Sequence, residues 1–177
     1  YFVNYFAKIP HLIRKNRSSV AVLSGKESFE DFKNLAADIF MYYGLGCRNV
    51  STIAVPESMD LVPLFDVLTL EDWVLDHTKY SNNYQYHKTL YLLNQIPHFD
   101  LGNLIVTEND ALVSPVGVLH VHRYSNKEVL NDWLVSNNEK IQCTIGTNFI
   151  PFGQAQNPSL DDFADGVNTY QFLTSLS

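Results

Sequence analysis

Cys47 is the residue of this sequence best placed to do chemistry. It stands in the Gly-Leu-Gly-Cys-Arg-Asn segment of residues 44–49, after a stretch with helical periodicity and before a β-type run. Glycine accepts a left-handed backbone and leaves room for another molecule to approach. A thiolate at such a corner can attack carbonyls and thioesters, and its own backbone N–H can hold a developing oxyanion. We therefore predict that Cys47 is a nucleophile; the alternative is a small side chain at a tight packing site.

The remaining cysteine and histidines offer weaker signals. Cys143 lies in the alternating run of residues 141–145, which is typical of a strand, and we expect it to pack. His120 and His122 lie two apart and share one strand face. That spacing suits a metal, but it also describes an exposed polar face, which we favour. No spacing of cysteines with histidines indicates ligation, so we predict no metal site. A distant histidine acting as base for Cys47 leaves a Cys–His hydrolase open.

Composition narrows the class of protein. The chain has 177 residues, of which 46% are hydrophobic and 18% charged, as expected for a globular domain. The net charge of −7 argues against a nucleic-acid partner. Two cysteines make no disulfide framework, which favours a reducing, cytoplasmic setting. No apolar run approaches the roughly 20 residues of a membrane span. The chain does not begin with Met, and we expect an upstream part to be absent.

The elements that must position Cys47 follow from periodicity and caps. Ser28 is a predicted N-cap, and the following helix carries Phe32, Ala36 and Ile39 on one face before Gly44 ends it. Residues 60–77 indicate two short helical pieces interrupted by Pro63. Strands alternating with helices predict an α/β fold, a three-layer sandwich with a mainly parallel sheet and helices on both faces. The other predicted strands are 19–24, 49–55, 103–107, 116–124 and 140–145, and the other helices are 82–95 and 125–134.

Several segments, taken in order, resemble the catalytic domain of the aldehyde dehydrogenase superfamily. Residues 23–26 (Leu-Ser-Gly-Lys) are similar to the Leu-Gly-Gly-Lys that precedes the nucleophile. Residues 44–47 stand in the place of the Gly-Gln-x-Cys nucleophile motif. Residues 114–116 (Ser-Pro-Val) and 151–153 (Pro-Phe-Gly) resemble a later Gly-Pro-Val and the Pro-Phe-Gly turn that lines the substrate site.

Within that superfamily, residues 42–51, 79–84 and 151–166 resemble the bioluminescence-type fatty acyl-CoA (long-chain acyl-protein thioester) reductases. The resemblance implies that Cys47 takes the acyl group of a fatty acyl-CoA or acyl-carrier thioester. It further implies that NADPH then reduces the acyl group to a fatty aldehyde. Phe152 and Gly153 are implied to lie near the substrate.

One departure bears on the chemistry. Superfamily members that oxidise aldehydes carry a general-base Glu just before the Gly-Gly-Lys, where this chain has Val22. Without that base, water is poorly activated to hydrolyse an acyl-enzyme. The resemblance therefore implies thioester chemistry rather than aldehyde oxidation, and leaves the base for Cys47 unassigned.

The resemblance also implies an incomplete enzyme. We interpret residues 1–18 as a lead-in from a missing upstream cofactor domain and residues 19–177 as the catalytic domain. No glycine-rich dinucleotide fingerprint occurs in the sequence, so NADPH is expected to bind mainly to the missing N-terminal dinucleotide-binding domain. No residue here is assigned to cofactor binding, and the chain alone is expected not to turn over. A non-catalytic interaction domain that keeps the fold is the alternative. The oligomeric state stays open, a homo-oligomer included.

Overall fold

A six-stranded sheet forms the centre of the protein in the computed structural model, which describes residues 1–13 and 16–176. The strand order is β3-β4-β5-β2-β1-β6. All neighbouring strands are parallel except β3 and β4, which pair antiparallel. The strands are β1 (Ser18–Val22), β2 (Val50–Pro56), β3 (Phe99–Asp100), β4 (Ile105–Glu108), β5 (Val118–Tyr124) and β6 (Ile141–Ile145).

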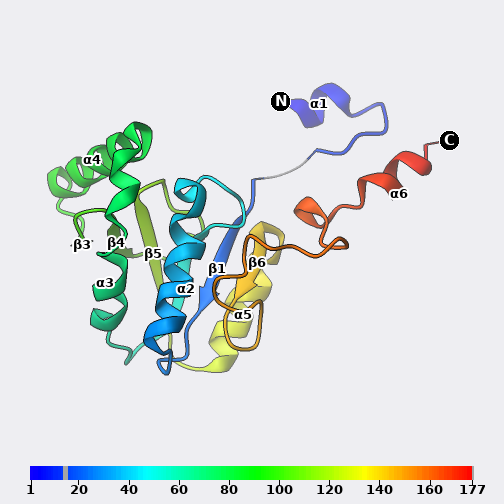
Figure 1. The fold of residues 1–177 in the computed structure, drawn as a ribbon. Helices are drawn as coiled ribbons and strands as arrows, with labels where there is room; N and C mark the ends of the chain where they lie inside the picture. Colours follow the sequence, from blue (N-terminus) through cyan, green and yellow to red (C-terminus); the bar gives the residue numbers. More distant parts are fainter. Residues whose placement is uncertain (14–15, 177) are drawn as a thin grey trace.

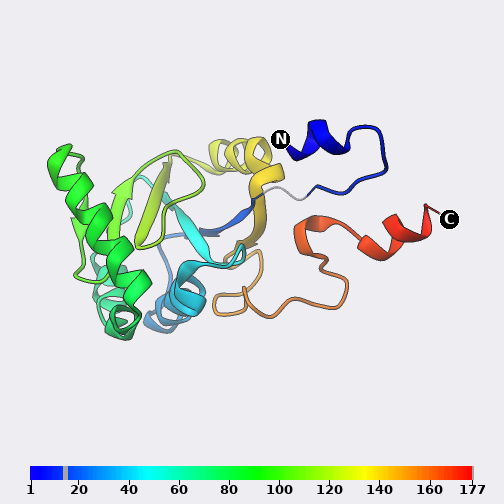
Figure 2. The same cartoon turned by 90° about the horizontal axis from the view of Figure 1, so that it is seen from above.

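Helices cover both faces of this sheet. Helices α2, α3 and α4 lie on one face and α5 lies on the other, as Figures 1 and 2 show together. The predicted three-layer α/β sandwich with a mainly parallel sheet is therefore confirmed. The helices are α1 (Phe2–Phe6), α2 (Phe29–Phe40), α3 (Val62–Leu68), α4 (Thr78–Leu93), α5 (Lys127–Asn137) and α6 (Thr169–Thr174), with 3-10 turns η1 (Met41–Gly44), η2 (Asp72–Asp76), η3 (Asn138–Lys140) and η4 (Ala164–Gly166).

The central strands are apolar on both sides because both sides are covered. In β1, Ala21 packs in the larger core under α2, α3 and α4, whereas Val20 packs in the smaller core under α5. In β2, Ile53 and Ala54 divide between the two cores in the same way. Alternate side chains of one strand point to opposite faces, so a continuous apolar run fills both layers.

Local signals place α2 and α3. Ser28 and Asp31 form a capping box at the start of α2: Ser28 Oγ accepts from Asp31 N–H (3.2 Å), and Asp31 Oδ2 accepts from Ser28 N–H (2.9 Å). The predicted cap is confirmed. The predicted interruption of a helix at Pro63 is wrong, because Pro63 lies in the first turn of α3. Backbone N–H groups in the first turn have no acceptor within the helix, so a proline, which lacks an N–H, is tolerated there.

His120 and His122 are buried, and the prediction of an exposed polar strand face is wrong. They lie on central strand β5, facing the α5 layer, with 3% and 9% of their surface exposed. His120 Nδ1 lies 2.7 Å from the carbonyl of Ala111, and His122 Nδ1 lies 3.0 Å from Asp110. The ring of His122 stacks on Trp133 of α5 at 4.3 Å. The loop that precedes β5 and the helix that follows it therefore cover this face.

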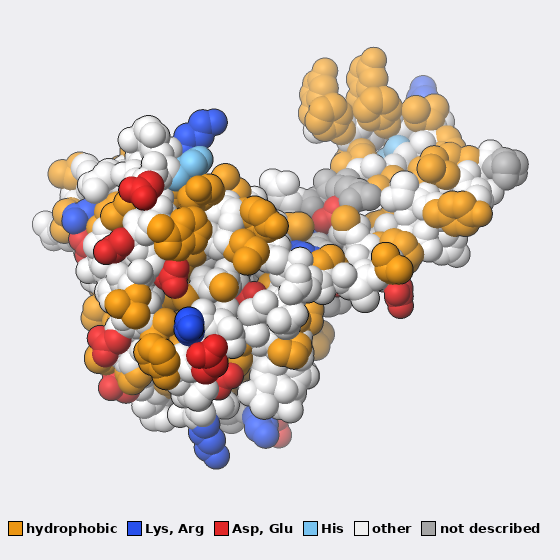
Figure 3. Space-filling view, viewed as in Figure 1, with side chains coloured by type: hydrophobic (Ala, Val, Ile, Leu, Met, Phe, Trp, Pro, Cys, Tyr) orange, Lys and Arg blue, Asp and Glu red, His pale blue; other side chains and the backbone are white. Residues whose placement is uncertain are grey.

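The two ends of the chain extend away from the sheet as arms (Figures 1 and 2). No residue of α1 or α6 is buried. Apolar side chains, among them Phe2 and Tyr5, gather on the N-terminal arm (Figure 3). The predicted lead-in of residues 1–18 includes residues 14–15, which lie outside the described residues, and it ends with Ser18, the first residue of β1. Among the described residues, no helix has the length and apolarity needed to cross a membrane.

Candidate active site around Cys47

A strained turn leads from α2 to Cys47. After α2, the backbone becomes left-handed at Tyr42 (φ 53°), Tyr43 (φ 59°) and Gly44 (φ 70°). The left-handed conformation costs a non-glycine residue roughly 1–2 kcal/mol, so two tyrosines in succession store strain. The ring of Tyr43 stacks on His77 with the centroids 4.0 Å apart, which helps to hold the turn. Strain of this kind persists where surrounding contacts determine the backbone, often at functional sites.

Asn49 is the side chain that fixes this turn. It is 2% exposed, and its Nδ2 group donates to the carbonyls of Asp38 (3.1 Å), Ile39 (3.3 Å) and Met41 (2.7 Å). Its Oδ1 accepts from Gly46 N–H at 2.9 Å. The last carbonyls of a helix need partners from outside the helix. One amide therefore caps the end of α2 and closes the loop that presents Cys47.

Cys47 itself is exposed and lines an open cleft of about 440 Å³ at the amino ends of β1 and β2. Within the described part of the chain, its backbone N–H has no hydrogen-bond acceptor. That group is consequently free to face a developing oxyanion. The cleft is lined by Asn16, Arg17, Ser18, Gly44, Leu45, Gly46, Cys47, Ser51, Val113, Ser114 and Asp165.

Cys143 lies beneath this corner and is buried. Ser19, fully buried in β1, donates from Oγ to the carbonyl of Cys47 at 3.0 Å, and the same Oγ lies 3.0 Å from Cys143 Sγ. Burial raises the pKa of the Cys143 thiol. The predicted packing role of Cys143 in a strand is confirmed, and Ser19 ties the floor of the site to the corner above it.

The side chain next to Cys47 points away from the cleft. Arg48 donates from Nη1 to the carbonyl of Ala155 at 2.8 Å and forms an ion pair with Asp162. Asp38 is a buried residue of α2, and its carboxylate accepts from the backbone N–H groups of Gly153 (2.7 Å) and Ala155 (3.1 Å). Burial raises the pKa of Asp38. These contacts fasten the loop of residues 151–157 to α2.

Comparison with known proteins identifies the fold. No protein-family model matches the chain, and no curated protein matches it. Methylmalonate-semialdehyde dehydrogenase from Oceanimonas doudoroffii has a TM-score of 0.51 at 11% identity, over 81% of this chain and 36% of that chain. The fold is aldehyde-dehydrogenase-like. The Delta-pyrroline-5-carboxylate dehydrogenase from Mycobacterium tuberculosis, solved bound with NAD, has a TM-score of 0.48 at 13% identity, over 84% of this chain and 33% of that chain. This chain thus spans about a third of the length of these structures.

Within this aldehyde-dehydrogenase-like fold, the predicted substrate residues lie apart from the cleft that Cys47 lines. Phe152 packs against the larger core, and Gly153 lies against Asn34 of α2, where an added Cβ would come within 3.1 Å. Neither residue is among those lining the cleft. Their role in substrate binding stays a prediction.

Val22 also lies apart from Cys47. Ser19 contacts Cys47 at the amino end of β1, and Val22 lies three residues further along, about 10 Å at the rise of an extended strand. Val22 and Ser24 line a different cavity at the carboxyl edge of the sheet. The structure therefore does not support the argument that Val22 replaces a base beside Cys47.

The connection from β1 to α2 does not fit a dinucleotide. A dinucleotide phosphate needs free amides and a positive potential at the start of a helix. After β1, the backbone N–H groups of Ser24 and Gly25 instead donate to the carboxylate of Glu27, at 2.6 and 3.0 Å. Asp31 occupies the start of α2, and hydrogen bonds with Ser28 keep its pKa below the ordinary value. The amides that a pyrophosphate would need at this connection are therefore already bonded to a carboxylate.

Metal and histidine chemistry are not built into the described site. None of the six histidines is among the residues lining the Cys47 cleft. In the described ranges, 1–13 and 16–176, no group of three or more His, Cys, Asp or Glu side chains could hold a metal ion. Sequence reasoning predicted Cys47 as the nucleophile, which stays a prediction. It did not predict Asn49, Ser19 and Asp38, whose roles depend on contacts with other segments. Their only sequence signal is a polar side chain within or beside an apolar run.

Proposed function

We propose that this chain is the catalytic domain of an acyl-CoA reductase, in which Cys47 accepts an acyl group from a fatty acyl-CoA or acyl-carrier thioester. The exposed thiol on a strained, braced corner, open to a cleft, is the observation that carries the proposal. The aldehyde-dehydrogenase-like fold supports it. A reactive thiol must stay reduced, so the proposal includes a cytoplasmic setting.

The acyl-transfer step uses groups of this chain. The thiolate of Cys47 attacks the carbonyl carbon of the thioester and forms a new C–S bond. The backbone N–H of Cys47 has no acceptor among the described residues, so it is available to donate to the oxyanion. The bond to the CoA sulfur then breaks, its electron pair leaves with that sulfur, and the CoA thiolate takes a proton from water. Cys47 is left as a thioester of the acyl group.

NADPH, when bound, would supply the hydride that reduces the acyl group to an aldehyde. Because the connection after β1 does not fit a dinucleotide, we propose that NADPH binds mainly to a separate N-terminal dinucleotide-binding domain. The exposed apolar side chains of the N-terminal arm are consistent with packing against such a domain, since large apolar patches usually mark interaction surfaces.

Two other functions predict different products. A Cys–His thioester hydrolase would release free acid, but no histidine lines the cleft that holds Cys47. A non-catalytic interaction domain that keeps the fold would leave the thioester intact.

Release of CoA tests the proposal. On mixing the chain with octanoyl- or hexadecanoyl-CoA without NADPH, we expect a burst of about one CoA thiol per chain. Cys47→Ser should abolish the burst, while Cys143→Ser, as the matched control, should retain it. Steady release of CoA with free acid would favour the hydrolase, and no release with a folded chain would favour the interaction domain.

A further inference from the structure

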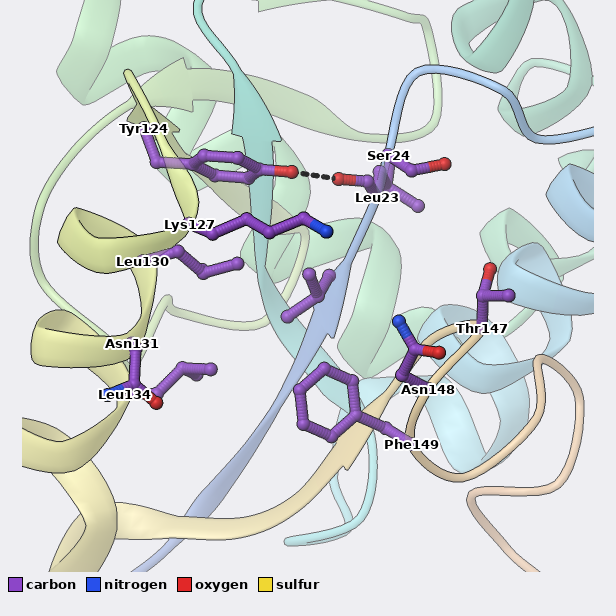
Figure 4. Close-up of a pocket in the computed structure, with 11 residues that line it drawn as sticks. Leu23, Ser24, Tyr124, Lys127, Leu130, Asn131, Leu134, Thr147, Asn148 and Phe149 are labelled. Carbon is purple, nitrogen blue, oxygen red and sulfur yellow. Dashed lines mark hydrogen bonds between the residues drawn. The ribbon is translucent and has the colours of Figure 1, made fainter.

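A second cavity lies at the opposite edge of the sheet from Cys47. It has a volume of about 240 Å³ and lies between the carboxyl end of β1, the first turns of α5 and the turn after β6. Figure 4 shows Leu130 and Leu134 of α5 on one side and Asn148 and Phe149 on the other. A dry apolar cavity of about 150 Å³ already accepts benzene. This cavity can therefore hold a somewhat longer aliphatic group.

The turn that forms one wall depends on a glycine. Gly146 has φ of 151°, and an added Cβ would lie 2.6 Å from the carbonyl oxygen of Val22. Gly146 N–H donates to the carbonyl of Ile150 at 2.9 Å, and Phe149 N–H donates to the carbonyl of Gly146 at 3.0 Å. The close approach to β1 turns the chain out of β6 and places Phe149 opposite α5. The position of this wall is therefore set by the backbone contacts of Gly146.

One cationic side chain, that of Lys127, lines this cavity. The side chain of Lys127, the first residue of α5, extends across it toward Leu23 and Ser24 (Figure 4). No carboxylate of the described residues lies within ion-pair distance of its ammonium group. The nearby carboxylate of Glu27 is already held by the backbone and hydroxyl of Ser24 and by Gly25 N–H.

Apolar walls with one cation at the rim match one kind of ligand. We propose that this cavity binds an aliphatic monocarboxylate of medium chain length, with its carboxylate on Lys127 and its chain between Leu130, Leu134 and Phe149. A single ammonium group balances a single carboxylate charge, whereas a phosphate monoester would bring about two. The site is separate from the Cys47 cleft and does not depend on the proposed acyl transfer, because Ser18 lines one and Val22 the other, at opposite ends of β1.

Titration with octanoate tests this site, using calorimetry and amide chemical shifts of the 177-residue chain. We expect saturable binding with shifts centred on residues 22–24, 127–134 and 147–149. Lys127→Gln should raise the dissociation constant for octanoate about fivefold or more, because one exposed ion pair contributes about 1 kcal/mol. Lys33→Gln, an exposed lysine of α2 on the other face of the sheet, is the matched control and should change nothing. Leu134→Phe, which fills the cavity at a half-buried position, should also weaken binding.

Ligand variants separate charge from chain. Uncharged 1-octanol should bind more weakly than octanoate, and octyl phosphate should bind no more tightly. The proposal is overturned if no saturable octanoate binding occurs to the folded chain, or if both Lys127→Gln and Leu134→Phe bind as the wild type does. Shifts centred on the Cys47 cleft would also overturn it. Shifts of the cavity residues that depend on protein concentration without octanoate would assign the cavity to a second copy of the chain and would overturn it too.

Discussion

Replacing Asn49 with alanine tests how the corner that carries Cys47 is held. The change removes the two Nδ2 donors, which three carbonyls share, and one acceptor at Oδ1, from a side chain that is 2% exposed. At a net value of about 1 kcal/mol per proton donated or accepted, the expected loss of unfolding free energy is about 3 kcal/mol. That is a large part of the 5–15 kcal/mol typical of folded domains. The strain of Tyr42 and Tyr43 would no longer be opposed.

Urea unfolding followed by circular dichroism measures this loss. Asn83→Ala is the matched control, because Asn83 is an exposed asparagine that donates to one helical carbonyl, and it should cost less than about 1 kcal/mol. Asn49→Asp should be at least as destabilising as alanine at pH 7, since a buried carboxylate would face three carbonyl oxygens. It should recover partly at pH 4, where a protonated carboxyl can donate. A cost below about 1 kcal/mol for Asn49→Ala would refute the reasoning.

Two further perturbations test other contacts of the site and the sheet. Burial raises the pKa of Asp38, so the folded protein binds this proton more tightly than the unfolded chain, and stability from this group falls as pH rises through the raised pKa. The unfolding free energy of the wild type relative to Asp38→Asn should therefore be larger at pH 4 than at pH 7; equal differences at both values would contradict this. Gly146→Ala should cost about 2 kcal/mol or more in urea unfolding, because its Cβ would clash with Val22. Gly102→Ala, at φ of 90° with nothing within 4 Å, should cost less, and equal costs would count against the clash.

Local patterns predicted the elements that position Cys47. The Ser28 cap and the apolar spacing of Phe32, Ala36 and Ile39 predicted α2, because capping and amphipathic periodicity act within a few residues. The β-type runs on either side predicted β1 and β2. The flanking glycines predicted the exposed corner at Cys47, but no local pattern indicated that Tyr42 and Tyr43 before it have a left-handed backbone.

Contacts between one element and another were not predictable in this way. His120 and His122 read as a polar face, but the loop that includes Ala111 and the helix that includes Trp133 cover them. The distance of Val22 from Cys47 follows from strand direction, since Val22 ends β1 whereas Cys47 precedes β2. In a parallel sheet, these positions lie at opposite edges. The resemblance of residues 23–26 and 44–47 to family motifs did not reveal that Val22 and Cys47 lie at opposite edges of the sheet.

The most direct test of the account is the location of the acyl group. The chain is incubated with acyl-CoA without NADPH, digested, and the peptides are mapped by mass spectrometry. We predict a mass increase of one acyl group on the peptide that contains Cys47, and none on the peptide that contains Cys143. Acylation of any other residue in its place, or no acylation of a folded chain, would contradict the claim that Cys47 is the nucleophile.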